Sequence, residues 1–362
     1  MNRWVEIDLG AIKNNIALIK KEIGHPKTKL MTVVKANAYG HGLVEISKMC
    51  EGTNVDYLAV STFDEAKTLR GNGISLPILI IGYIYTEDIE KAISDNITLS
   101  IYSREIADEV IKAASKLNKV ASVHLKIDTG MHRLGFLPEE FIQNYKELTS
   151  DKNLNVEYLY SHFADFHNPE HSQKQIAVLK GLLSEIKTKN LPIPKVHFSR
   201  SESLTDDNVD FAMVRPGLAL YGLCDNIAGL KPALTFKTKI AQVKNIKAGD
   251  AVGYCLTYQA PRNMKIATIA CGYADGYGRN FSNKGEVIID GKKLPVIGRV
   301  CMNLTIVDVS EVSDVKMGDE VILIGKDNGV EITANELAEK IDTIPYEIVS
   351  RIPSDIPRIY KK

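Results

Sequence analysis

The fold of this chain can be traced outward from one run of residues, Met31-Thr32-Val33-Val34-Lys35-Ala36-Asn37-Ala38-Tyr39-Gly40-His41-Gly42. Its apolar, β-branched first half predicts a strand that is buried on both faces. Lys35 stands at the end of that strand, before a turn rich in Ala, Asn and Gly. Such a lysine either packs its stem and extends its ammonium to water, or is an amine with a lowered pKa that can act as a nucleophile.

Short aliphatic runs recur through the first part of the chain, and amphipathic segments separate most of them. Helix-capping signals such as Thr62 before Asp64 and Glu65 support the segments as helices. Strand and helix in alternation indicate parallel pairing, and eight strands close a (β/α)8 barrel of the TIM type. We therefore expect an α/β barrel over residues 1–228. The expected strands are 31–36, 56–60, 76–83, 97–102, 120–127, 156–161, 195–199 and 211–215, and the expected helices are 41–51, 62–72, 87–95, 103–117, 138–150 and 172–189.

A different pattern predicts a second domain over residues 229–362. Alternating apolar and polar residues indicate half-buried strands, and the dipeptides Asp290-Gly291 and Asn328-Gly329 indicate tight turns between them. We expect a mostly antiparallel β domain with one helix near residues 334–342, followed by an extended segment that ends at Lys362. The expected strands include 237–243, 265–269, 286–289, 304–307 and 320–324.

Composition and charge argue against several classes of partner. Lys+Arg and Asp+Glu both number 45, so the chain has no net basic field that would attract nucleic acid or anionic lipid. The most apolar run, 76–84, is too short to span a membrane, and the N-terminus lacks the apolar core of a signal peptide. The five cysteines form no C-x-x-C pair. We expect a cytoplasmic protein that acts on a small molecule, without metal, membrane or nucleic acid.

Polar side chains follow several of the expected barrel strands, at the end where barrel active sites lie. Lys35 follows the first strand, His162 the sixth and Arg215 the eighth. The last two loops of such barrels often bind phosphate, and here they offer the Ser201 hydroxyl and the Gly217 backbone. A phosphate there and a lysine on the first strand favour pyridoxal phosphate as the cofactor.

The motif over residues 33–42 resembles the pyridoxal-phosphate attachment signature of alanine racemases. Further motifs that resemble this family follow in the same order along the whole chain, which argues against coincidence. They are 128–135 (DTGMHRLG), 161–164 (SHFA), 213–217 (MVRPG), 272–276 (GYADG), 298–302 (GRVCM) and the pair Tyr346-Glu347. The resemblance implies a barrel followed by a β domain, in agreement with the periodicity.

The resemblance also implies a two-base reaction that interconverts L-alanine and D-alanine and supplies D-alanine for cell-wall peptidoglycan. Lys35 would hold the cofactor as an internal aldimine and act as the base on one face of the substrate Cα. Tyr254 of a partner subunit would act on the opposite face, so the enzyme would be a homodimer with shared active sites. His162 would bridge Tyr254 and Arg215, and Arg215 would contact the pyridine nitrogen.

Further site residues are implied by the same resemblance. Arg133 matches an arginine that contacts the cofactor phenolate and the substrate carboxylate, and Lys126 matches a lysine that is carbamylated in many family members. Met302, Tyr254 and Tyr346 would line a pocket that fits a methyl side chain. Phosphate contacts are implied for Tyr39, Ser201, Gly217, the Leu218 backbone and Tyr346.

The chain departs from the family pattern at three positions. Arg200 replaces an Asn near the phosphate, Asn303 stands where Asp is common, and Cys255 follows Tyr254 where Gly is commoner. These differences concern local geometry rather than the reaction.

Other functions are less well supported by the same residues. A racemase of broader scope, which accepts serine or a basic amino acid, stays the alternative. A decarboxylase would present an acidic group where Arg215 stands. A cofactor-homeostasis protein would lack the second domain that carries Tyr254. We interpret His167 and His171, which flank Asn168-Pro169-Glu170, as part of a solvated loop rather than as metal ligands.

Overall fold

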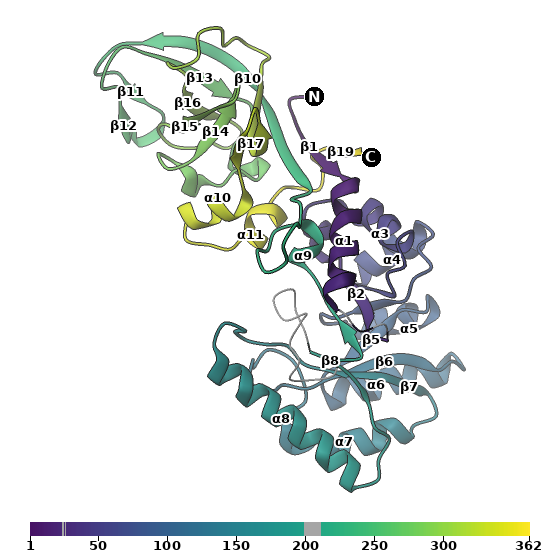
Figure 1. The fold of residues 1–362 in the computed structure, drawn as a ribbon. Coiled ribbons are helices and arrows are strands. Elements are labelled where there is room, and N and C mark those ends of the chain that lie inside the picture. The colour runs from purple at the N-terminus through teal and green to yellow at the C-terminus, as the bar shows by residue number, and fades with distance from the viewer. Residues whose placement is uncertain (24, 26, 199–210) are drawn as a thin grey trace.

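The computed structural model describes residues 1–23, 25, 27–198 and 211–362. It has two lobes, a barrel at the lower right of Figure 1 and a β domain at the upper left. The two termini lie side by side between these lobes, because β1 (Arg3–Asp8) pairs with β19 (Arg358–Lys361). None of the helices in the described part of the chain is long and apolar enough to cross a membrane.

Eight parallel strands form the barrel, at the places where strands are expected. The first ends at Val33 rather than at residue 36, and residue 199, the expected end of the seventh, lies outside the described residues. Their order in the sheet is β8-β7-β6-β5-β4-β3-β2-β9. The Ala212 amide donates a hydrogen bond to the Val196 carbonyl at 3.0 Å, which joins β8 to the residue before β9 at the two ends of this sheet. The strands are β2 (Lys29–Val33), β3 (Tyr57–Val60), β4 (Ile78–Ile80), β5 (Thr98–Ile101), β6 (Ala121–Lys126), β7 (Leu154–Tyr160), β8 (Lys195–His197) and β9 (Met213–Val214).

Helices surround the barrel, and the six that the amphipathic pattern predicts are confirmed. Thr62 accepts a hydrogen bond from the Glu65 amide at 3.3 Å and so caps its helix as expected. The stretch from His167 to His171, interpreted above as a solvated loop, instead contains the start of the helix α8 (Pro169–Thr188). Asn168 caps this helix by accepting a hydrogen bond from the His171 amide at 3.1 Å. The helices are α1 (Leu9–Ile23), α2 (Lys35–Tyr39), α3 (Leu43–Glu51), α4 (Phe63–Gly71), α5 (Thr86–Ser94), α6 (Arg104–Lys116), α7 (Pro138–Ser150), α8 (Pro169–Thr188) and α9 (Leu218–Tyr221).

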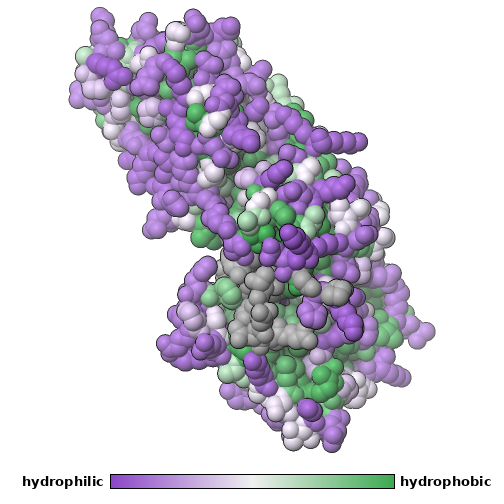
Figure 2. Space-filling view, viewed as in Figure 1, coloured by the Kyte–Doolittle hydropathy of each residue, from purple (hydrophilic) through white to green (hydrophobic). Residues whose placement is uncertain are grey.

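A nine-stranded, mostly antiparallel sheet forms the second lobe, as expected. Its longest strand, β10 (Leu234–Ile246), pairs with β1, β13 and β17. Hydrophilic side chains cover most of this lobe on the face shown in Figure 2. Its other strands are β13 (Met264–Ile269), β14 (Glu286–Ile289), β15 (Lys292–Pro295), β16 (Thr305–Asp308), β17 (Glu320–Asp327) and β18 (Val330–Ile332), beside the separate pair β11 (Ala251–Val252) and β12 (Tyr258–Gln259) and the 3-10 turns η2 (Tyr254–Leu256), η3 (Tyr273–Asp275) and η4 (Arg279–Phe281).

Two details of the second lobe differ from the local sequence pattern. The first strand of the chain, β1, belongs to this sheet, and Val5 lies opposite Phe236. The predicted division between residues 228 and 229 stays a prediction. The segment after α10 (Ala334–Lys340) is not wholly extended, because residues 345–350 form α11 (Pro345–Ser350). Proline at the first helical position, where no amide donor is needed, favours a helix start there.

Candidate active site at the barrel mouth

The turn that carries Lys35 has an unusual backbone. The strand β2 ends at Val33, and Lys35 begins the short element α2 directly after it. Ala36, Asn37 and Ala38 all have left-handed backbone angles, with φ of 53°, 54° and 51°. Each costs an L-residue about 1–2 kcal/mol, so the surrounding structure must hold the turn in place.

Two side chains hold this turn on the barrel side. The Glu65 carboxylate on α4 accepts the Ala36 amide at 2.6 Å and the Ser61 amide at 2.9 Å. Asn37 accepts the Leu43 amide at 2.9 Å. Glu65 thereby ties the turn after β2 to the end of β3. In the sequence it was visible only as an acidic residue in the first turn of a helix.

The C-terminal segment holds the same turn from the other side. The Arg358 guanidinium donates to the Gly40 carbonyl at 3.1 Å and to the carbonyls of three residues in its own segment. A Cβ at Gly40, where φ is +80°, would lie 2.2 Å from the Val349 carbonyl oxygen. Only glycine permits this close approach of α11 to the turn. The other carbonyls that Arg358 reaches belong to Ile352, Pro353 and Ile356.

Aromatic rings continue this contact into the mouth of the barrel. The ring of Tyr39 lies 4.9 Å from that of Tyr221 and 5.5 Å from that of Tyr346, between ring centroids. Tyr221 donates to the Val33 carbonyl at 2.9 Å. His41 is fully buried against Tyr221, and burial lowers its pKa to about 4, so its ring is neutral. Tyr346 therefore reaches the site although it lies at the far end of the sequence.

Burial and like charges lower the pKa of two lysines at the mouth. Burial lowers the pKa of Lys35, Arg133 lowers it further, and Glu65 partly opposes the shift. Burial, Arg215 and Arg133 lower the pKa of Lys126 to about 7. Both amines are thus more readily deprotonated than an ordinary lysine.

Arg215 and Lys126 share one aromatic neighbour. The Lys126 Nζ lies 4.5 Å from the centre of the Tyr160 ring, and the Arg215 guanidinium carbon lies 5.4 Å from it. Arg215 also donates to the Ser161 carbonyl at 2.6 Å. Burial lowers its pKa to about 10, so the guanidinium stays charged near neutral pH. Cation–π contact with Tyr160 compensates part of the cost of burying these cations.

The loop that leads to Arg133 is shaped by Asp128. One carboxylate oxygen of Asp128 accepts the amides of Gly130, Met131 and His132 at 2.9, 3.0 and 3.0 Å. Burial raises the pKa of Asp128, but these hydrogen bonds and His132 outweigh it, and the pKa is lowered. The carboxylate is therefore ionised and keeps the loop folded back on itself.

These residues surround a cavity of about 830 Å³, a size usual for a cofactor or substrate site. The structure brings together nine of the residues that the sequence predicts. They are Lys35, Tyr39, Lys126, Arg133, His162, Arg215, Gly217, Leu218 and Tyr346.

Three predicted residues are not placed in this cavity. Ser201 lies outside the described residues, as does Arg200. Among the described residues, the lining does not include Tyr254 or Met302, which lie on the β domain with 67% and 57% of their surface exposed. Nine of the predicted residues therefore share this cavity, and Tyr254 and Met302 are not among its described lining.

The structure explains two departures from the family pattern. Cys255 has φ +60°, a left-handed conformation in which glycine is less strained. Asn303 donates its amide to the Asp275 carboxylate at 3.1 and 3.2 Å, and Asp275 also pairs with Arg3 at 2.8 Å. An aspartate at position 303 would instead repel Asp275.

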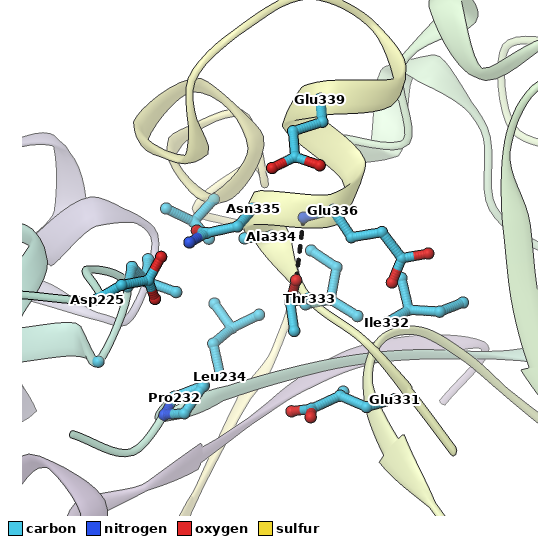
Figure 3. Close-up of a pocket in the computed structure, with 15 residues that line it drawn as sticks. Asp225, Pro232, Leu234, Glu331, Ile332, Thr333, Ala334, Asn335, Glu336 and Glu339 are labelled. Atoms are coloured by element: carbon cyan, nitrogen blue, oxygen red, sulfur yellow. Dashed lines mark hydrogen bonds between the residues drawn. The ribbon is translucent and has the colours of Figure 1, made fainter. Parts of the chain in front are cut away.

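A second cavity of about 340 Å³ lies between the barrel and the β domain. Figure 3 shows Asp225, Pro232 and Leu234 on one side and α10 on the other, where Thr333 accepts the Glu336 amide at 3.0 Å. It contains none of the predicted site residues within the described ranges. Nor do those ranges place three or more His, Cys, Asp or Glu side chains so as to hold a metal ion.

Comparison with known proteins relates both lobes to one family. Residues 7–225 match the model described as "Alanine racemase, N-terminal domain", and residues 233–360 match "Alanine racemase, C-terminal domain". The alanine racemase of Methanococcus maripaludis is 41% identical over 367 residues, covering 99% of this chain and 98% of the relative. That of Halothermothrix orenii is 39% identical over 366 residues, covering 99% and 96%.

Solved structures give the same relationship. The alanine racemase of Clostridium difficile 630 superimposes with a TM-score of 0.92 at 36% identity, covering 100% of this chain and 96% of that one. The alanine racemase of Bacillus anthracis with bound L-Ala-P gives a TM-score of 0.92 at 34% identity, covering 100% and 95%. Sequence and structure thus agree over the full length of the chain.

Proposed function

The chain belongs to the alanine racemase family, whose members are pyridoxal-phosphate-dependent isomerases, and from this we propose that it interconverts L-alanine and D-alanine by a two-base mechanism. The observation that carries the proposal is Lys35, an amine of lowered pKa that lines the same cavity as Arg215 and Tyr346. Such an amine can hold a cofactor and exchange a proton at the substrate Cα.

The residues of the cavity fit pyridoxal phosphate as the cofactor. Lys35 would hold it through Nζ, and the buried cation of Arg215 would face the pyridine nitrogen. When bound, the cofactor withdraws electrons from the substrate Cα and makes its proton more acidic. A guanidinium stays protonated at neutral pH, so Arg215 would orient the ring without giving it a proton. Phosphate contacts are proposed for Tyr39, Gly217, the Leu218 backbone and Tyr346, and for Ser201 outside the described residues.

The second base is proposed to be Tyr254 of another copy of the chain. In one copy Tyr254 is exposed on η2, and the described lining of that copy's own cavity does not include it. Leu256 beside it is 70% exposed, and Met302 and Leu304 are also exposed on the same domain. Large apolar side chains on a surface favour an interface, and a homodimer would place Tyr254 opposite Lys35. His162 would then connect Tyr254 with Arg215.

The substrate would be bound through its carboxylate, and the size of the pocket would limit its side chain. Arg133 lines the cavity and offers a planar cation for the carboxylate. Tyr346, with Met302 and Tyr254 of the second copy, would leave room for a methyl group. We further propose that the enzyme acts in the cytoplasm and that its D-alanine enters peptidoglycan synthesis.

Carbamylation of Lys126 is part of the proposal. A neutral amine attacks carbon dioxide, forming an N–C bond with loss of one proton, and a pKa of about 7 leaves much of Lys126 neutral near pH 7. The product would be an anion between Arg133 and Arg215 in place of a third cation. It would draw Arg133 into the cavity.

Three measurements test the proposed function. Racemisation rates for L-alanine, L-serine and L-lysine should rank alanine first, and a higher rate for lysine would favour the alternative of broader scope. The purified protein should have an absorption band near the edge of the visible range, and this band should vanish in Lys35→Ala. The absorbance measurement does not depend on activity. Specific activity should fall on dilution in step with loss of the dimer in sedimentation, and a fully active monomer would refute the shared site.

A further inference from the structure

Gln175 is a fully buried residue of α8 that belongs to none of the sequence motifs described above. Its side-chain amide binds two loops of the barrel mouth. Nε2 donates to the Thr129 hydroxyl at 3.1 Å and to the His162 carbonyl at 3.0 Å, and Oε1 accepts the Ala164 amide at 3.0 Å. One amide thus joins the loop after β6, which leads to Arg133, to the loop after β7, which carries His162.

The hydrogen bonds of Gln175 continue to a third strand end. The Thr129 and Ser161 hydroxyls share a hydrogen bond of 2.8 Å, and the Ser161 carbonyl accepts from Arg215 at 2.6 Å. Gln175, Thr129, Ser161 and Arg215 are all buried. A continuous polar network therefore runs from the helix α8 to the guanidinium proposed to face the cofactor ring.

Only a glutamine satisfies all partners at this position. The Ala164 amide can only donate and the His162 carbonyl can only accept, so the orientation of the Gln175 amide is fixed. A glutamate would turn an oxygen toward the His162 carbonyl. A methionine of similar length would leave the amide, the carbonyl and the hydroxyl without this partner.

We infer that Gln175 is a positioning residue that holds the loops of Arg133 and His162, and through Ser161 the guanidinium of Arg215, at fixed relative positions for the reaction. This inference rests on the proposed function. The cavity lining, within the described residues, does not include Gln175. It therefore acts through the residues that it holds, and displacement of a reacting group by about 1 Å can lower a rate about 100-fold.

Gln173 provides a matched control. It lies on the same helix two residues earlier and is exposed, so Gln173→Glu and Gln173→Met make the same chemical changes without touching either loop. The holoenzymes of these variants and of Gln175→Glu and Gln175→Met are compared by steady-state kinetics and by hydrogen exchange read by mass spectrometry.

We expect both Gln175 variants to lose at least about 10-fold in kcat, more than any change in their folded fraction explains. Amide exchange should become faster in peptides that cover residues 128–135 and 161–165, and unchanged elsewhere in the barrel. The ratio of Gln175→Glu activity to wild-type activity should rise as the pH is lowered, because a protonated carboxyl regains one donor. Both Gln173 variants should behave as wild type.

Two results would overturn the positioning role. The first is that kcat and the amide exchange rates of the two loops are the same in the Gln175 variants as in the Gln173 variants. The other is faster exchange throughout the barrel with activity lost only in proportion to unfolding, which would show a purely structural role. If the wild-type protein racemises no amino acid, the proposed function fails by itself, while the exchange in the two loops still tests whether Gln175 holds them.

Discussion

The Arg358 side chain donates a hydrogen bond to the Gly40 carbonyl at 3.1 Å, although 318 positions separate the two residues in the chain. Gly40 belongs to the turn that follows Lys35, and Arg358 begins β19. The strand β19 thereby fixes the turn that carries the proposed catalytic lysine, and α11, which precedes β19, brings Tyr346 against Tyr39.

Replacement of Arg358 by alanine should loosen this turn. The variant loses hydrogen bonds to four backbone carbonyls, and we expect a loss of about 2–4 kcal/mol in stability and weaker retention of the cofactor. Thermal unfolding should shift down by at least about 3 °C. Arg351→Ala is the control, because Arg351 is exposed and its salt bridge with Glu347, four residues earlier, is worth less than about 1 kcal/mol. Equal shifts in both variants would contradict the role of Arg358.

Replacement of Gly40 by alanine separates steric from conformational effects. Gly40 has φ +80° and its Cβ would meet the Val349 carbonyl, whereas Gly329 has φ +84° and open space around its Cβ. Gly329→Ala should cost only about 1 kcal/mol, the expense of a left-handed L-residue. Gly40→Ala should cost clearly more and should lower the absorbance of bound cofactor. Thermal unfolding of the two variants gives the comparison, and a Gly40→Ala loss no larger than that of Gly329→Ala would show that α11 can move away freely.

Lys126 should make stability depend on pH. Its pKa is about 7 in the folded protein, against an ordinary value of 10.5. Between these values the unfolded chain binds a proton that the folded protein does not, so stability rises with pH by at most about 1.4 kcal/mol per unit. Below about pH 7 this contribution is constant. Unfolding measured in bicarbonate-free buffer between pH 7 and 10 should show this slope in wild type and less of it in Lys126→Met.

The exposed Lys112→Met variant, on α6 of the same barrel, should keep the wild-type slope. An unchanged slope in Lys126→Met would mean that Lys126 is protonated in the folded protein.

Tyr254→Phe should remove proton exchange on one face of the substrate. Loss of a general acid or base lowers a rate about 100- to 10,000-fold, so racemisation should fall by that order. In deuterated water, the two alanine enantiomers should differ in the rate at which Cα deuterium appears. Tyr85→Phe, an exposed tyrosine on α5's N-terminal side, should leave both rates unchanged. Full exchange of both enantiomers in Tyr254→Phe would refute the two-base assignment.

Local pattern in the sequence determined the barrel and the position of Lys35 in it. The strand β2 and the barrel strands that follow it are short and largely apolar, and amphipathic helices separate most of them. Burial on both faces leaves such apolar runs in a parallel sheet. The helix over residues 138–150 matches its prediction at both ends. Thr62 caps its helix as its spacing from Glu65 predicts.

Only the tertiary structure decided which distant residues complete the site. Three polar residues show this: Glu65, Gln175 and Arg358. Their hydrogen-bond partners cannot be predicted from the neighbouring sequence, because each binds backbone atoms of another segment. The pairing of β1 with β10 could not be foreseen for the same reason, since a strand pattern gives burial but not its partner. Periodicity records which side of an element is buried, whereas the contacts that position catalytic groups depend on how elements far apart in the chain are packed together.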